Sequence, residues 1–194
     1  MNKAERTKAF IIEKTAPVFN TKGYAGTSLA DIEGATGLTK GSIYGNFANK
    51  DEVALAVFDY NLSKVNTAFN LALSRHVLAK DKLMVYAEKY GFVFNSNYID
   101  GGCPILNTAT EADDTHPALR SKAAKAILSW KNKLISIIEE GNRKNEFLQA
   151  IDAEQIALTM IAMMEGGIMI AKVTGNTKFM ASIMQSMKKL IQEL

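Results

Sequence analysis

Hydrophobic residues recur at intervals of three or four positions along almost the whole chain. This spacing gathers them on one face of an α-helix. No segment shows the alternation of apolar and polar residues that is typical of a half-buried strand. The pattern therefore predicts an all-α protein of about nine helices.

Glycines, prolines and capping residues divide this pattern. A first helix is expected to end before Gly23, a second to end at Gly37, and a third to run from Lys40 to about Phe47. The later helices are expected over about 50–77, from about 80 past 92, over 105–111, from 117 past 138, and over about 153–173 and 177–193. We therefore expect a three-helix domain over 1–48 and a helical bundle over 49–194.

The segment LTKGSIYGNFANKDEV, residues 38–53, has few apolar and many hydrogen-bonding side chains. Two short helices joined by a glycine turn have the geometry of a helix-turn-helix. On its second helix, lysine can pair with guanine and asparagine with adenine, and two glycines would let the backbone approach a duplex. Base or phosphate contacts are expected from Thr27, Ser28, Thr39, Lys40, Gly41, Ser42, Tyr44, Asn46 and Lys50. An ordinary helical hairpin on the surface is the competing interpretation.

The charge distribution favours a nucleic-acid partner. Residues 1–50 carry seven Lys and Arg against four Asp and Glu, whereas the remaining residues carry sixteen of each. The net charge of +3 therefore comes from the N-terminal quarter, which contains the predicted helix-turn-helix.

The stretch GYAGTSLADIEGATGLTKGSIYGNFANKDEV resembles the DNA-binding domain of the tetracycline-repressor (TetR) family. The matching positions are Phe19, Gly23, Tyr24, Thr27, Ile32, Gly37, Tyr44, Phe47 and Lys50, and the resemblance covers about residues 6–55. It implies an all-helical homodimer that regulates transcription in response to a ligand, most often as a repressor released from a palindromic operator. Glu33 departs from the family's usual alanine, and Asn46 from its common histidine.

The last two predicted helices are rich in methionine, with seven of the nine methionines between residues 160 and 187. They are too apolar to be solvated and need a partner surface, either within the monomer or in a second copy. The family resemblance implies a four-helix dimer bundle. The residues expected in the dimer interface are Ile156, Met160, Met164, Ile168, Met180, Ile183, Met184 and Met187.

The apolar and aromatic residues of the remaining helices, with a few polar groups among them, suit a small-molecule pocket and an ordinary hydrophobic core equally well. The candidate ligand-binding residues are Tyr86, Tyr90, Phe92, Cys103, Ile105, Asn107, Trp130, Met163 and Glu165. Cys103 precedes Pro104 at an expected helix start, where the helix dipole favours a reactive thiolate. Its apolar neighbours favour simple burial instead, so we expect a noncovalent effector.

No catalytic side-chain set, metal site or cofactor motif stands out, so an enzyme is not expected. With a single cysteine the chain can form no internal disulfide, which suits the cytoplasm. Its most apolar stretch, residues 156–171, is interrupted by polar residues and glycines, and we interpret it as a buried helix. A helical carrier or adaptor that does not recognise DNA sequence remains the alternative.

Overall fold

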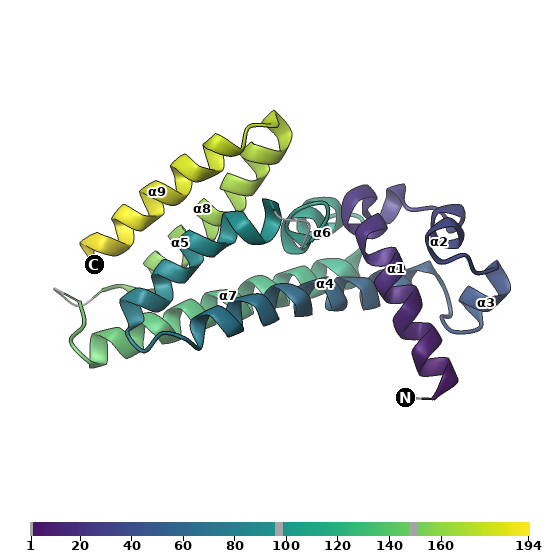
Figure 1. Ribbon diagram of the computed structural model, residues 1–194, viewed down its shortest axis with the longest axis horizontal. Helices are drawn as coiled ribbons and strands as arrows, with labels where there is room; N and C mark the ends of the chain where they lie inside the picture. Colours follow the sequence, from purple (N-terminus) through teal and green to yellow (C-terminus); the bar gives the residue numbers. More distant parts are fainter. Residues whose placement is uncertain (1, 96–98, 148–150) are drawn as a thin grey trace. The chain divides into compact units, whose positions relative to one another are not determined.

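The computed structural model describes residues 2–95, 99–147 and 151–194, with the backbone alone over 92–95. All regular secondary structure in these ranges is α-helical, as predicted (Figure 1). The helices are α1 Lys3–Gly26, α2 Leu29–Thr36, α3 Lys40–Tyr44, α4 Lys50–Leu73, α5 Ala79–Asn95, α6 Pro104–Ala112, α7 Pro117–Arg143, α8 Ala153–Thr174 and α9 Thr177–Glu193.

The chain forms two compact units. The first contains residues 1–64 and 99–124, and the second contains residues 65–98 and 125–194. Helices α4 and α7 each contribute to both units. The helix-turn-helix and α6 therefore belong to the same compact unit. A domain boundary after residue 48, as expected from the sequence, assigns them to different domains.

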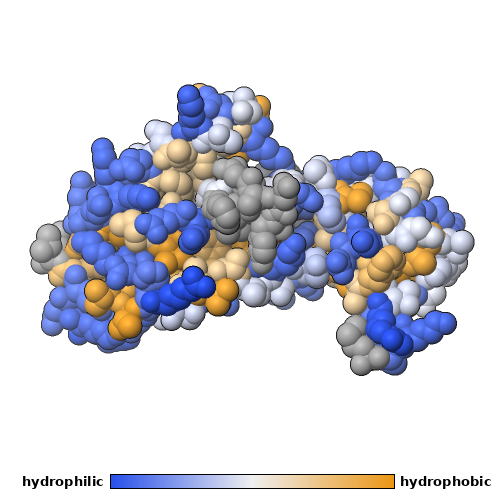
Figure 2. All heavy atoms as spheres, viewed as in Figure 1, coloured by the Kyte–Doolittle hydropathy of each residue, from blue (hydrophilic) through white to orange (hydrophobic). Residues whose placement is uncertain are grey.

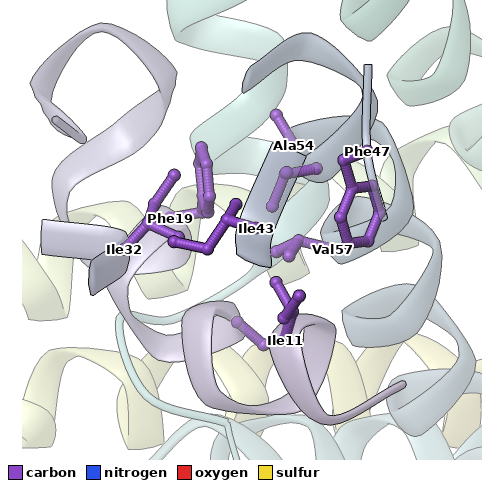
Figure 3. Packing of buried hydrophobic residues seen from close by; sticks show 9 residues of the cluster. Ile11, Phe19, Ile32, Ile43, Phe47, Ala54 and Val57 are labelled. Atoms are coloured by element: carbon purple, nitrogen blue, oxygen red, sulfur yellow. The ribbon is translucent and has the colours of Figure 1, made fainter. Parts of the chain in front are cut away.

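An apolar core holds the first three helices to the start of α4 (Figure 3). It consists of Ile11, Ala16, Phe19, Ile32, Ile43, Phe47, Val53, Ala54 and Val57, all at most 7% exposed. Each helix contributes only its inward face, so the polar face of α3 is left at the surface.

Two N-terminal helices differ in length from the sequence prediction. Helical hydrogen bonding continues to Gly26 in α1, but Gly23 interrupts the helical dihedrals with a φ of 73°, close to the predicted end. Helix α3 ends at Tyr44 rather than near Phe47. Gly45 follows as the C-cap, and its N–H donates to the Gly41 and Ile43 carbonyls.

In the second unit, α8 packs against α9, and α5 packs against both. A Cβ at Gly167 would lie 2.5 Å from the Met180 sulfur, so the two helices approach closely there. Within the described residues, α8 alone is long and apolar enough to cross a membrane by length and composition. Met160 and Met164 of this helix are fully buried inside the chain.

Candidate functional site

Local capping positions the two helices of the helix-turn-helix. Ser28 begins α2, with its hydroxyl accepting from the Asp31 N–H at 3.1 Å and the Asp31 carboxylate accepting from the Ser28 N–H at 2.9 Å. Thr39 begins α3, and its hydroxyl accepts from the Ser42 N–H at 3.3 Å. These side chains complete hydrogen bonds that a helix start lacks.

The outer face of α3 is polar and accessible. Thr39, Lys40 and Gly41 are exposed, and Ser42, Tyr44 and Asn46 are half-buried. A Cβ at Gly41 would meet no atom within 4 Å, so the backbone there is open to an approaching molecule. The Asn46 side-chain amide donates to the Ser42 carbonyl at 2.9 Å, which orients it.

Lys50 lies at the start of α4 against the end of α1. Its ammonium donates to the Tyr24 and Thr27 carbonyls at 3.0 and 3.1 Å, and lies 4.2 Å from the centroid of the Tyr24 ring. An ammonium has three N–H donors, and these carbonyls take two. The Tyr24 hydroxyl donates to Asp51, and this hydrogen bond, with burial and the Asp51 charge, raises the pKa of Tyr24 to about 12.

Thr27 has no exposed surface, and its hydroxyl donates to the Gly23 carbonyl at 2.6 Å. Its placement therefore gives no support to the predicted phosphate contact. Ser28, the next residue, is exposed. The Ser28 hydroxyl is accessible, but it donates to the Asp31 carboxylate at 2.8 Å.

An exposed polar helix, held by caps over an apolar helix-turn-helix core, is a DNA-reading arrangement. Residues 11–57 match the family Bacterial regulatory proteins, tetR family, and residues 79–187 match the family Tetracyclin repressor-like, C-terminal domain. The chain belongs to the TetR family of DNA-binding transcriptional regulators.

Individual TetR-family proteins resemble the chain over most of its length. The HTH-type transcriptional regulator TtgR of Pseudomonas putida is 30% identical over 168 residues, covering 84% of this chain and 79% of the relative. A TetR-family regulator from Cytophaga hutchinsonii is 48% identical, with a TM-score of 0.95 over 100% of this chain and 97% of its own. One from Chloroflexus aurantiacus is 35% identical, with a TM-score of 0.94 over 100% and 98%. These proteins are transcriptional regulators, not enzymes.

Four aromatic rings gather in the second unit of this TetR-family chain. Tyr86 stacks on Phe69 with centroids 5.1 Å apart, and Trp130 lies with its centroid 6.0 Å from that of Tyr90 and 6.5 Å from that of Phe69. The Tyr90 hydroxyl donates to Glu165 at 2.8 Å. The structure thus brings together four of the predicted ligand-binding residues, Tyr86, Tyr90, Trp130 and Glu165. Phe69 also belongs to this cluster but was not predicted. Its helical spacing from Val65 and Leu73 is the only signal in the sequence that could have indicated it.

The remaining candidate ligand residues are placed differently. Met163 is half-buried on α8. Cys103 and Ile105 are at most 1% exposed, and both belong to the first unit together with Asn107. The side chain of Phe92 lies outside the described residues. The nine candidates therefore divide between the two units.

Asn107 joins α6 to the end of α1. Its side-chain amide donates to the Asn20 and Gly101 carbonyls at 3.0 and 2.8 Å. The Asn20 amide in turn donates to the Asp100 and Gly102 carbonyls at 2.5 and 2.9 Å. A Cβ at Gly101, whose φ is 87°, would lie 2.6 Å from the Asn20 carbonyl oxygen, so only glycine allows this approach.

Glu111 of α6 makes a second connection to α1. Its carboxylate accepts from the Tyr24 and Ala25 N–H groups at 2.7 and 2.8 Å, directly after the break at Gly23. No local pattern in the sequence indicates this contact, because Tyr24 lies 87 residues away from Glu111. Within the described residues, no group of three His, Cys, Asp or Glu side chains could hold a metal ion.

Most residues expected at a dimer interface are buried within the chain itself. Met160, Met164, Ile168, Met180, Met184 and Met187 are at most 6% exposed, while Ile156 and Ile183 are half-buried. Figure 2 shows hydrophobic side chains in patches on a mostly hydrophilic surface. On α8 and α9 the exposed large hydrophobic residues are Leu158, Met169, Ile170, Val173 and Phe179.

Proposed function

We propose that this TetR-family regulator is a cytoplasmic repressor that binds a palindromic operator as a homodimer and releases it when a small molecule binds the C-terminal bundle. The exposed face of α3 carries this proposal. It presents Lys40, Ser42 and Asn46 around a glycine with open space above it, and these groups suit the edges of bases in a major groove.

The exposed apolar residues of α8 support dimerisation. Leu158, Met169, Ile170 and Val173 are between 37% and 82% exposed, and a Cβ at Gly166 would meet no atom within 4 Å. These residues recur at helical spacing, so they form one stripe along α8, which we call the outer stripe. An identical stripe on a second copy would cover it in a symmetric contact.

The aromatic cluster in the second unit and the connections between α6 and α1 support an effector response. The rings of Tyr86, Tyr90 and Trp130, with the carboxylate of Glu165, provide an apolar environment with a few polar groups, as small-molecule sites do. Because α6 is hydrogen-bonded to the end of α1, a shift of α6 would move the helix that supports the helix-turn-helix.

Selection of bound fragments from the source genome tests the proposal. Recovered fragments should share an inverted repeat, because a two-fold dimer presents two identical α3 helices. Half-site centres should lie about 34–36 Å apart, or a multiple of this distance. Recovery of fragments without a shared repeat would contradict both the dimer and the operator.

Lys40→Ala and Asn46→Ala should each lower discrimination between operator and unrelated duplex. We assign both side chains to base edges, and each good base contact contributes about 1–3 kcal/mol of discrimination. Competition binding with the recovered operator and a scrambled duplex measures the effect.

Lys50→Ala is the contrasting variant. A lost phosphate contact should weaken binding to all duplexes and reduce the slope of log affinity against log salt concentration by about one unit. Equal loss on both duplexes for Lys40→Ala or Asn46→Ala would contradict the base-reading role.

Gly41→Ala should stabilise the protein and weaken its DNA complex. Alanine in place of glycine favours a helix by about 1 kcal/mol, and the new Cβ meets nothing in the free protein. At a backbone that approaches bases, however, the methyl group would occupy the space of the DNA. Thermal unfolding and operator titration of the same variant should therefore change in opposite directions. Unchanged operator affinity would place the duplex elsewhere.

A further inference from the structure

Glu33 links the two helices of the helix-turn-helix at their junction. Its backbone carbonyl accepts from the Gly37 N–H at 2.8 Å, at the end of α2. Its side-chain Oε1 accepts from the Lys40 N–H at 2.7 Å, at the start of α3. Helix α3 has no acidic residue in its own first turn, so Glu33 supplies from α2 the negative charge that a helix start favours.

We propose that Glu33 is a positioning residue that sets the sequence specificity of DNA binding. The inference rests on the proposed function, since it needs an operator to be read. With Glu33 bonded to the Lys40 N–H, the first turn of α3 is fixed relative to α2, and the side chains of Lys40 and Ser42 project from a defined backbone.

The same hydrogen bond affects phosphate binding. Free amides at a helix start attract phosphates, and phosphate contacts carry no sequence information. The Glu33 carboxylate occupies the Lys40 amide and repels a phosphate that approaches it. This disfavours a phosphate contact at the Lys40 amide, so side-chain contacts with bases, which differ between sequences, carry a larger share of the binding through α3.

The charges on this face support that conclusion. Lys40 is the only charged residue of α3, and its N–H is bonded to the Glu33 carboxylate. The formal charges of Lys40 and Glu33 sum to zero, so these two residues add no net positive charge of the kind that drives non-specific binding. Removing the carboxylate should raise affinity for any duplex and reduce preference for the operator.

Glu33→Gln tests the charge while keeping an oxygen that can accept from Lys40. Affinity for a scrambled duplex should rise about threefold at low salt, and the ratio of operator to scrambled affinity should fall by a similar factor. Glu33→Ala also removes the hydrogen bond, so the ratio should fall about tenfold. The probes are the duplex that the wild-type protein recovers from a random pool and a scrambled duplex of equal length and composition.

Glu139→Gln is the matched control, because it removes the same charge from an exposed position on α7. It should leave the affinity ratio unchanged. A second selection with Glu33→Gln should return sites that are degenerate at the base pairs nearest the start of α3, a result that lost stability alone would not produce.

The inference is overturned if Glu33→Gln keeps the wild-type affinity ratio and recovers the same sites, whether or not Glu33→Ala melts at a lower temperature. Its failure can be told apart from failure of the proposed function. If the wild-type protein prefers no duplex, the proposed function fails. If the wild type discriminates and Glu33→Gln discriminates equally, only the role of Glu33 fails.

Discussion

Ile170→Lys is expected to convert the proposed homodimer into a folded monomer and to lower operator affinity at least about 100-fold, because a monomer engages one half-site at a time. Ile170 belongs to the outer stripe of α8 and is 37% exposed in the single chain. A lysine there can remain solvated in the monomer, so the free energy of unfolding of the monomer itself, without the contribution of dimerisation, should change by less than about 0.5 kcal/mol. In a dimer the two charges would be buried and face one another.

Met164→Lys is the variant that shows the effect of a charge in the interior of the chain, as opposed to one in the proposed interface. Met164 has no exposed surface, so an unpaired charge there should destabilise the monomer by more than about 4 kcal/mol. Val77→Lys, at a residue that is 77% exposed and lies between α4 and α5, is the surface control. Sedimentation velocity and thermal unfolding on all three variants distinguish the two effects. A stable dimer for Ile170→Lys would place the interface elsewhere.

The composition of α8 explains why its orientation was not predictable from the sequence. Met160, Met164 and Ile168 lie on one side and are buried, whereas Met169, Ile170 and Val173 lie at neighbouring positions and are exposed. When both sides of a helix are apolar, hydrophobic periodicity cannot tell which side its own chain covers. The sequence predicts that α8 and α9 need a partner surface, but α5 already provides part of it.

The helix-turn-helix was more predictable because its signals are local. Ser28 with Asp31 and Thr39 with Ser42 are caps formed within three residues, and the Thr39 cap begins α3 at Lys40, as expected. Gly37 likewise ends α2 in a left-handed conformation, with a φ of 67°. Contacts between helices lacked such signals. Glu33 was noticed only as a departure from a small residue, and its carboxylate caps the helix that follows.

The candidate ligand residues also differ in how far the sequence could indicate their surroundings. Tyr86, Tyr90 and Trp130 follow helical spacing and are indeed gathered in one cluster. Asn107 looked equally suitable as a polar group for a ligand, but its amide is bonded to the Asn20 and Gly101 carbonyls. Amide side chains serve pockets and backbone turns alike, so only the fold separates the two roles.

Glu111→Ala is expected to lower the melting temperature by about 3–8 °C, because it removes an ionised acceptor from two backbone N–H groups, a loss of about 1–3 kcal/mol. The Tyr24 and Ala25 N–H groups directly follow Gly23, where the backbone dihedrals of α1 depart from helical values. Glu111→Gln keeps one acceptor oxygen but turns an NH₂ group towards the other donor, so it should lose at least half as much.

The same variants test whether α6 controls DNA binding. Lys50 donates to the Tyr24 carbonyl, and Glu111 accepts from the Tyr24 N–H, so both groups hold the same peptide segment beside the helix-turn-helix. Glu111→Ala should therefore weaken operator binding even well below the melting temperature. The loss of affinity there should be larger than the small fraction of unfolded protein can explain. Asp114→Ala, which removes an exposed carboxylate three residues further on, is the matched control and should change neither property. If Glu111→Ala and Asp114→Ala behaved alike in both assays, the α6–α1 connection would have no part in holding the DNA-binding conformation.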